Sequence, residues 1–279
     1  MKVVLFCGGL GTRIRTDGSA LPKPMTPIGN RPILWHIMRY YAHFGHTEFI
    51  LCLGYGAKAV KDYFLHYEET ESNDFVLRNG CKEVELLGSD ISDWTITFVD
   101  TGHETAIGER LRRVRQHLGD DEMFLANYGD GLSDAPMNDL IATLPDHHVG
   151  SLLSVSPQDS FHVVGADADG NLTGLVAVAD MDMRINGGFF VLRQGIFDYL
   201  DEGDDLVMNG CVRAAEDGRF TANRYDGFWA CMDTVKERMQ LEELNRTGNP
   251  PWAVWRKESE PALGDDVAPV VTLAPAPVP

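Results

Sequence analysis

The stretch that decides the fold is Val3-Val4-Leu5-Phe6-Cys7-Gly8-Gly9-Leu10-Gly11-Thr12-Arg13, an apolar run followed directly by a glycine-rich loop. A short apolar run that ends in glycines is typical of a buried strand. The glycines allow backbone N–H groups to approach phosphate oxygens closely, and Thr12 adds a hydroxyl donor. Ile14 stands where a dinucleotide fingerprint requires a third glycine, and the Gly-Lys-Ser/Thr of a Walker A loop is absent. The loop therefore predicts a phosphate site of another kind.

Cations follow this loop closely. Arg13, Arg15 and Lys23, the last within Lys23-Pro24-Met25, are concentrated near the glycines of an otherwise acidic chain. Three positive charges beside a phosphate-binding backbone favour a polyanionic ligand such as a nucleoside triphosphate.

Strand-like and helical segments alternate through the first half of the chain. This order predicts an α/β fold with a doubly wound, mostly parallel, Rossmann-like sheet, whose ligands lie outside the carboxyl ends of the strands. Two runs joined across Asp169-Gly170 predict a β-hairpin annex. The expected strands are Val3–Cys7, Phe49–Leu53, Thr95–Val99, Met123–Asn127, Val163–Ala168, Leu172–Val178 and Gly188–Leu192, and the expected helices are Ile33–Phe44, Ala57–Tyr67, Glu109–Leu118, Leu206–Glu216 and Val235–Arg246.

The domain organisation follows from length and composition. The 279 residues suit one large domain with an annex. We expect this domain to span residues 1–257. Residues 258–279 are rich in proline and alanine and contain acidic residues but no cation, which predicts a flexible, polyproline-like tail.

Charge excludes several classes of partner. The chain has 24 Lys+Arg and 42 Asp+Glu, a formal net charge of −18, and a pI near 4.8. Such a surface repels phosphate backbones and anionic lipids, so we expect no nucleic-acid and no membrane partner. The five scattered cysteines form no CxxC pair, and the apolar start at Val3–Cys7 is too short for a signal peptide. These features predict a cytoplasmic protein with reduced thiols.

Two acidic residues are candidates for binding a divalent cation. Asp130 lies in Tyr128-Gly129-Asp130-Gly131, where flanking glycines expose its carboxylate. Asp233 stands just ahead of an expected helix, where an N-cap role is the alternative. Mg²⁺ commonly takes one or two protein carboxylates and completes its shell with phosphate and water. Asp130 and Asp233 therefore predict a Mg²⁺ site.

Together these motifs resemble the sugar-1-phosphate nucleotidyltransferases, and most narrowly the glucose-1-phosphate cytidylyltransferases. The resemblance covers about residues 1 to 257, and it implies a nucleotide-binding half at about 1–135 and an acceptor-binding half at about 136–257. The blocks that carry it, in chain order, are Gly8–Arg13, Lys23–Met25, Ile28-Gly29, Pro32–Met38, Gly54-Tyr55, Thr97–Gly102, Arg110-Leu111, Tyr128–Gly131, Asn186–Leu192 and Phe228–Thr234.

The resemblance implies a Mg²⁺-dependent reaction in which CTP and a sugar 1-phosphate, glucose 1-phosphate by default, give a CDP-sugar and pyrophosphate. It implies that Arg13, Lys23 and Asp130 act in catalysis and that Asp130 and Asp233 hold Mg²⁺. Asn186, Gly187 and Gly188 would bind the acceptor. The nucleotide would be held by Leu5, Gly8, Gly9, Gly11, Thr12, Arg13, Lys23, Arg110, Tyr128 and Gly129.

One departure from the family concerns the acceptor. The family has a Glu-Lys-Pro segment whose lysine contacts the acceptor phosphate, whereas this chain reads Leu175-Val176-Ala177-Val178-Ala179. Arg184 is the nearest basic residue and either replaces that lysine or is a surface residue. The acceptor could then be another hexose phosphate, a cyclitol phosphate or a phosphonate. A catalytically silent CTP-binding regulatory protein is the alternative from another class.

The resemblance also implies self-association. Relatives are commonly trimers or hexamers, so we expect a homo-oligomer, with the Trp252–Trp255 region as a candidate contact.

Overall fold

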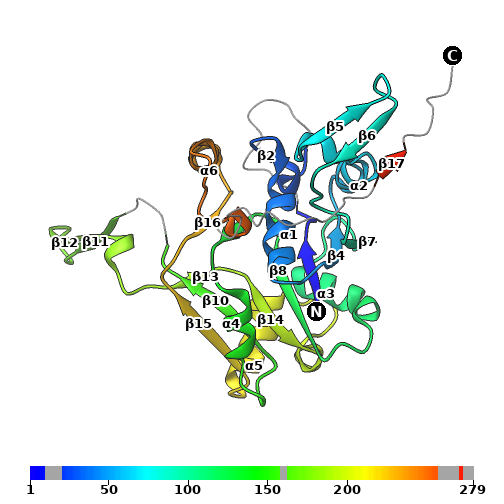
Figure 1. Ribbon diagram of the computed structural model, residues 1–279. Helices are drawn as coiled ribbons and strands as arrows, with labels where there is room; N and C mark the ends of the chain where they lie inside the picture. The colour runs from blue at the N-terminus through cyan, green and yellow to red at the C-terminus, as the bar shows by residue number, and fades with distance from the viewer. Residues whose placement is uncertain (10–20, 158–161, 257–269, 273–279) are drawn as a thin grey trace.

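A computed structural model describes residues 1–9, 21–157, 162–256 and 270–272 (Figure 1). Its centre is an eight-stranded sheet in the order β13-β10-β14-β8-β1-β4-β7, with β15 beside β10. The strands of this sheet are β1 (Lys2–Phe6), β4 (Glu48–Leu53), β7 (Thr95–Asp100), β8 (Met123–Tyr128), β10 (Gly150–Val155), β13 (Ile185–Asn186), β14 (Phe190–Arg193) and β15 (Phe220–Tyr225).

Strand directions confirm the predicted fold class. β1 pairs in parallel with both β4 and β8, and β4 pairs in parallel with β7. β14 is antiparallel to β8 and to β10, so the sheet is mixed toward the half that we expected to bind the acceptor. The helices are α1 (Ile33–His43), α2 (Ala57–Leu65), α3 (Ile107–Leu118), α4 (Met137–Ala142), α5 (Val212–Glu216) and α6 (Val235–Arg246).

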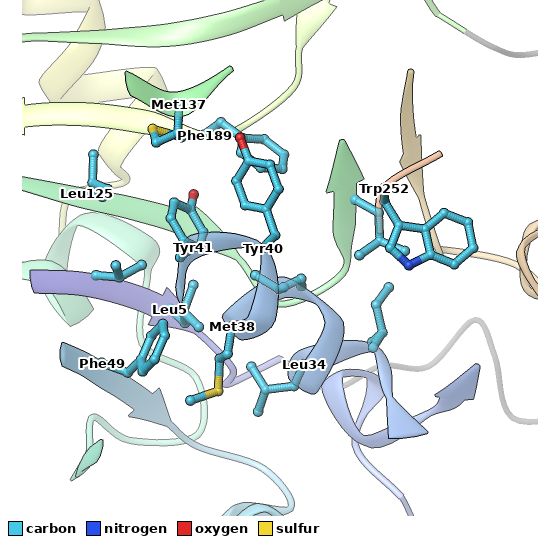
Figure 2. Close-up of a cluster of buried hydrophobic side chains, with 14 of the residues drawn as sticks. Leu5, Leu34, Met38, Tyr40, Tyr41, Phe49, Leu125, Met137, Phe189 and Trp252 are labelled. Atoms are coloured by element: carbon cyan, nitrogen blue, oxygen red, sulfur yellow. The ribbon is translucent and has the colours of Figure 1, made fainter. Parts of the chain in front are cut away.

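Alternating side chains of the central strands divide the core into two clusters, as expected for a sheet covered on both faces. Val3 and Leu5 of β1 belong to the cluster that contains α1, whereas Val4 and Phe6 belong to the cluster that contains α3. Figure 2 shows the α1 cluster, in which the side chains of Leu34, Met38, Tyr40 and Tyr41 lie near those of Leu5, Phe49, Leu125 and Phe189. β1, the first strand expected from the sequence, therefore lies between the two clusters of the core.

Small sheets lie outside this centre. The predicted hairpin is present as β11 (His162–Ala166) and β12 (Leu172–Ala177), which pair only with each other and project from the body (Figure 1). β17 (Val270–Thr272) pairs with β6 (Glu83–Leu86), although we expected no strand in the tail; its Val-Val-Thr sequence is β-branched throughout. The remaining strands are β2 (Pro27–Ile28), β3 (Arg31–Pro32), β5 (Phe75–Arg78), β9 (Gly131–Ser133) and β16 (Trp229–Cys231).

The expected helix at 206–216 is divided. Leu206–Cys211 forms a π-helix, and α5 continues from it. The short 3₁₀ helices are Lys23–Met25, Glu69–Glu71, Val178–Asp180, Gln194–Tyr199 and Val254–Arg256. Within the described ranges, no helix combines the length and apolar character needed to cross a bilayer.

The Trp252–Trp255 region differs from its expected role. Trp252 is fully buried, packs against Phe228, and donates its indole N–H to Nδ1 of His36 at 3.3 Å. Trp255 packs edge-to-face against Trp35 of α1. This segment folds back onto α1 and completes the core of its own chain, which leaves Trp252 unable to serve as a contact between subunits.

Candidate functional site

The glycine loop begins at the carboxyl end of β1. Gly8 lies directly against the Arg110 guanidinium and the backbone of Gly54, so a Cβ at Gly8 would collide with the guanidinium and lie 3.0 Å from the Gly54 nitrogen. Among the described residues, none has an atom within 4 Å of a Cβ at Gly9. Packing therefore requires glycine at position 8, whereas the described part of the chain sets no such requirement at Gly9. Gly11, Thr12 and Arg13, together with Arg15, lie outside the described residues, and their roles stay predictions.

Arg110 supports this loop from behind. Its side chain comes from α3 and is 1% exposed, and its donors bond to the carbonyls of Leu53, Thr105 and His103 and to the Thr101 hydroxyl. Burial lowers the pKa of this guanidinium without neutralising it. We therefore expect its charge to act mainly as a fixed positive potential beneath Gly8; direct contact with a nucleotide stays a prediction.

Three charged side chains from distant parts of the sequence converge at the end of β8, the strand that pairs with β1. Lys23 lies in the 3₁₀ helix Lys23–Met25, Asp130 follows β8, and Asp233 follows β16. The Lys23 ammonium lies 2.5 Å from Oδ2 of Asp130 and also pairs with Oδ1 of Asp233. The side chains are 15%, 23% and 42% exposed respectively, so this cluster faces outward from a largely buried base.

The electrostatics of this cluster favour a cation. Burial lowers the pKa of Lys23, but the charges and hydrogen bonds of the two carboxylates outweigh burial and hold that pKa above its usual value. Burial raises the pKa of Asp130, and the charge and hydrogen bond of Lys23 oppose this rise. One ammonium between two carboxylates leaves a net negative cluster, which suits an additional positive charge.

The donor atoms also fit a divalent ion. One oxygen from Asp130, one from Asp233 and Sγ of Cys231 lie within 4.8 Å of one another. Mg²⁺ takes hard oxygen ligands, which the carboxylates supply and the thiol does not. Cys231 was not among the predicted site residues, although it stands two residues before Asp233 at the end of a strand, a spacing that places both side chains on one face.

Contacts of the Tyr128–Gly131 segment link Lys23 to the sheet. The Gly129 N–H donates to the Phe6 carbonyl at 3.2 Å, and a Cβ on Gly129 would lie 2.9 Å from Cγ of Pro24. This close approach holds the 3₁₀ helix of Lys23 against the end of β8. Leu5, in contrast, is fully buried, and its side chain belongs to the core rather than to the site.

The predicted acceptor loop reaches the same edge of the sheet. Nδ2 of Asn186 donates to the Tyr128 hydroxyl at 3.0 Å, and the Gly187 carbonyl accepts from Nε1 of Trp229 at 2.8 Å. The Gly188 N–H donates to Oδ1 of Asn186 at 2.9 Å. Asn186, Gly187 and Gly188 are thus adjacent to both β8 and β16, the strands that Asp130 and Asp233 follow.

Arg184 is engaged by the protein itself. Its guanidinium pairs with Asp226 and donates to the Tyr225 carbonyl at 2.9 Å and the Ser154 carbonyl at 3.5 Å. Residues 175–177 belong to the projecting hairpin, where Leu175 is 58% exposed. No residue from 175 to 179 is a cation, and the charge of Arg184 is largely compensated.

Comparisons with known proteins identify relatives of the chain and of its fold. No protein-family model matches the chain. The "Probable glucose-1-phosphate cytidylyltransferase" of Bacillus subtilis is 37% identical over 91% of this chain and 100% of its own length. The glucose-1-phosphate cytidylyltransferase of Salmonella typhi is 35% identical over the same shares. The crystal structure of HddC from Yersinia pseudotuberculosis has a TM-score of 0.61 at 18% identity, covering 87% of this chain and 98% of that one, and supports the fold.

The chain spans the full length of both cytidylyltransferase relatives and is more than a third identical to each. Together with the position of the predicted motifs at one sheet edge, this similarity confirms the resemblance found in the sequence. The chain belongs to the sugar-1-phosphate nucleotidyltransferase family, with glucose-1-phosphate cytidylyltransferases among its relatives.

Proposed function

We propose that this protein is a Mg²⁺-dependent cytidylyltransferase that converts CTP and a sugar 1-phosphate, glucose 1-phosphate by default, into a CDP-sugar and pyrophosphate. The observation that carries the proposal is the convergence of Lys23, Asp130 and Asp233 at the end of β8, the strand that pairs with β1 where the glycine loop begins. The glucose-1-phosphate cytidylyltransferases of the comparisons support CTP as the nucleotide. The placement of Asn186–Gly188 beside Tyr128 supports an acceptor on the adjoining side.

The chemistry requires positioning and charge stabilisation. A phosphate oxygen of the acceptor is already anionic at neutral pH and can attack the α-phosphorus in line without a general base. Gly8, Gly9, Gly11, Thr12 and Arg13 would hold the triphosphate, and Lys23 would turn its ammonium toward the developing charge. Asp130 and Asp233 would hold Mg²⁺, which when bound supplies electrostatic stabilisation of the reacting phosphates.

A changed acceptor is the second candidate within this chemistry. The family lysine is missing, and Arg184 is paired with Asp226, so binding of an acceptor phosphate by Arg184 would have to compete with an existing ion pair. These observations favour another hexose phosphate, a cyclitol phosphate or a phosphonate as acceptor.

We also propose a cytoplasmic homo-oligomer. An isolated two-stranded hairpin is marginally stable in water, and β11–β12 exposes apolar side chains on both faces. A second copy of the chain covering this hairpin would remove that surface from water. The exposed residues are Val163, Val164, Leu172, Leu175 and Val176.

The test is pyrophosphate release with CTP, UTP or dTTP, with and without Mg²⁺, across a panel of acceptors. The panel holds glucose 1-phosphate, other hexose 1-phosphates, cyclitol phosphates and phosphonates. We expect Mg²⁺-dependent release with CTP and at least one acceptor. CTP binding without release for any acceptor would contradict the proposal and favour the regulatory protein. The variant Arg184→Gln should leave the KM for the acceptor unchanged if Arg184 is structural, and raise it if Arg184 binds the acceptor.

A further inference from the structure

We propose that Cys231 converts the carboxylate pair into a three-ligand site for thiophilic divalent ions, such as Zn²⁺, Co²⁺ and Cd²⁺, that compete with Mg²⁺. The inference rests on the proposed function for the identification of Asp130 and Asp233 as metal ligands. It adds a ligand that Mg²⁺ does not use and predicts which class of ions blocks the site.

Strand pairing fixes Cys231 beside both carboxylates. β16 runs antiparallel to β9 with Cys231 opposite Gly131, the residue after Asp130, and the Met232 N–H donates to the Asp130 carbonyl at 3.0 Å. The Cys231 thiol donates a hydrogen bond to Oδ2 of Asp233 at 3.6 Å, and one ligand atom each from Asp130, Cys231 and Asp233 lie within 4.8 Å of one another. Two ligand atoms about 2.2 Å from a tetrahedral ion are also about 3.6 Å apart. An ion would therefore take the place of the thiol proton between Sγ and Oδ2 with little movement of these two atoms.

One thiol and two carboxylates suit thiophilic ions such as Zn²⁺ better than they suit Mg²⁺. Thiolate binds Zn²⁺, Co²⁺ and Cd²⁺ well and Mg²⁺ poorly, whereas carboxylates bind both classes. A Cys-Asp-Asp set provides three protein ligands, and a water molecule would complete a four-coordinate Zn²⁺ or Co²⁺ site. Mg²⁺ at the same place would use the carboxylate oxygens alone.

Binding has a defined proton balance. A metal–sulfur bond forms at Sγ, the S–H bond breaks, and the proton passes to solvent. Lys23 pairs with both carboxylates, so its ammonium must withdraw as the ion enters. No oxidant or reductant takes part.

Spectroscopy of the full chain with Co²⁺ as the probe tests this site without CTP. A thiolate bound to Co²⁺ gives a ligand-to-metal charge-transfer band in the near ultraviolet, which carboxylate ligation alone does not. We expect this band in the wild type and its loss in Cys231→Ser, which keeps the size of the side chain. Cys81→Ser is the matched control because Cys81 is exposed, whereas Cys7, Cys52 and Cys211 are buried; it should retain the band.

Competition provides the second readout. Removing a residue that only hydrogen-bonds to a metal ligand typically lowers metal affinity 10- to 100-fold. Loss of the thiolate, which is itself a ligand, should therefore raise the Zn²⁺ concentration that halves pyrophosphate release at least about tenfold. Each protein's inhibition is expressed relative to its own rate with Mg²⁺. Absence of the Co²⁺ band in the wild type, or its persistence in Cys231→Ser, would overturn the inference. A wild type that shows the band but releases no pyrophosphate with Mg²⁺ would contradict the proposed function and leave the thiophilic site standing.

Discussion

At the scale of single residues, Lys23 occupies the position between two carboxylates where a dication would compete with it. We expect Lys23→Ala to lower turnover by roughly 10²–10³-fold, because a cation aimed at the transferring phosphate is lost. The same change should lower the Mg²⁺ concentration needed for half-maximal rate, since the internal competitor has gone.

Steady-state pyrophosphate release over a Mg²⁺ titration measures both effects. Lys58→Ala is the control, since that side chain is 87% exposed and pairs only with Asp62 within its own helix among the described contacts. An unchanged turnover in Lys23→Ala would remove Lys23 from the catalytic set.

His36 makes stability depend on pH. Burial lowers the pKa of His36 to about 4 from 6.5, although its hydrogen bond with the Ile28 carbonyl opposes this shift. The neutral ring therefore stabilises the fold fully above pH 6.5, and this contribution is lost as pH falls toward 4, because the unfolded chain takes up the proton first. The loss amounts to about 3 kcal/mol.

Urea unfolding between pH 7 and pH 4 checks this expectation. In His36→Gln the free energy of unfolding should fall by about 3 kcal/mol less across this interval than in the wild type. His66→Gln, at an exposed position, should follow the wild type. Parallel curves for His36→Gln and the wild type would refute this role of His36.

The sequence predicted the carboxylates of the site but not the contacts between them. Asp130 and Asp233 could be proposed because glycines flank the first and an aromatic block precedes the second. Their shared contact with Lys23 could not be derived, since it depends on elements separated by 107 and 210 positions. Cys231 was missed for the same reason, because its approach to Asp130 follows from pairing of β16 with β9.

At the scale of elements, the turn before β14 depends on Gly188. Its φ is +76°, and a Cβ there would collide with Oδ1 of Asn127, which accepts from the backbone N–H groups of Tyr128 and Phe189. Gly188→Ala should lower the free energy of unfolding by about 2–4 kcal/mol, the sum of left-handed strain and steric overlap.

Gly218→Ala separates the two contributions. Gly218 has a φ of +69°, and no atom of the described residues lies within 4 Å of the position that a Cβ would take there, so only the strain of about 1 kcal/mol should remain. Equal losses in the two variants, measured by urea unfolding, would show that contact with Asn127 is not what requires glycine at 188.

The sequence predicted some strands of the central sheet and missed others. β1, β4 and β8 were located to within about a residue, because continuous apolar runs mark strands buried on both faces. β10 and β15 were missed: Gly150–Val155 and Phe220–Tyr225 mix polar and apolar residues, and their pairing with each other brings together segments far apart in the chain.

At the scale of the whole molecule, the β11–β12 hairpin is one of the apolar surfaces that the described chain leaves uncovered. Val164 and Leu175 are cross-strand partners that are 60% and 58% exposed. If a second copy covers them, the double variant Val164→Thr with Leu175→Thr should reduce the molar mass in light scattering, because burial of two large side chains at about 1.5–3 kcal/mol each is lost. Leu65→Thr, at a 76% exposed position on α2, should leave the mass unchanged. A monomeric wild type would contradict this arrangement.

The net charge of −18 has a local counterpart at the proposed site. Arg110 beneath Gly8 and Lys23 between Asp130 and Asp233 are cations in an acidic molecule, and the two carboxylates outweigh the charge of Lys23. The proposed site therefore depends on these few cations and on the carboxylates that position one of them.

The most direct test of this account compares CTP-dependent pyrophosphate release in the wild type, Asp130→Asn and Asp139→Asn, with Mg²⁺ and the best acceptor of the panel. Asp139 is exposed on α4 and controls for the loss of one carboxylate charge. We predict wild-type rates for Asp139→Asn and a loss of at least about 100-fold for Asp130→Asn. A near-normal rate for Asp130→Asn would contradict the claim that the Lys23–Asp130–Asp233 cluster is the catalytic centre.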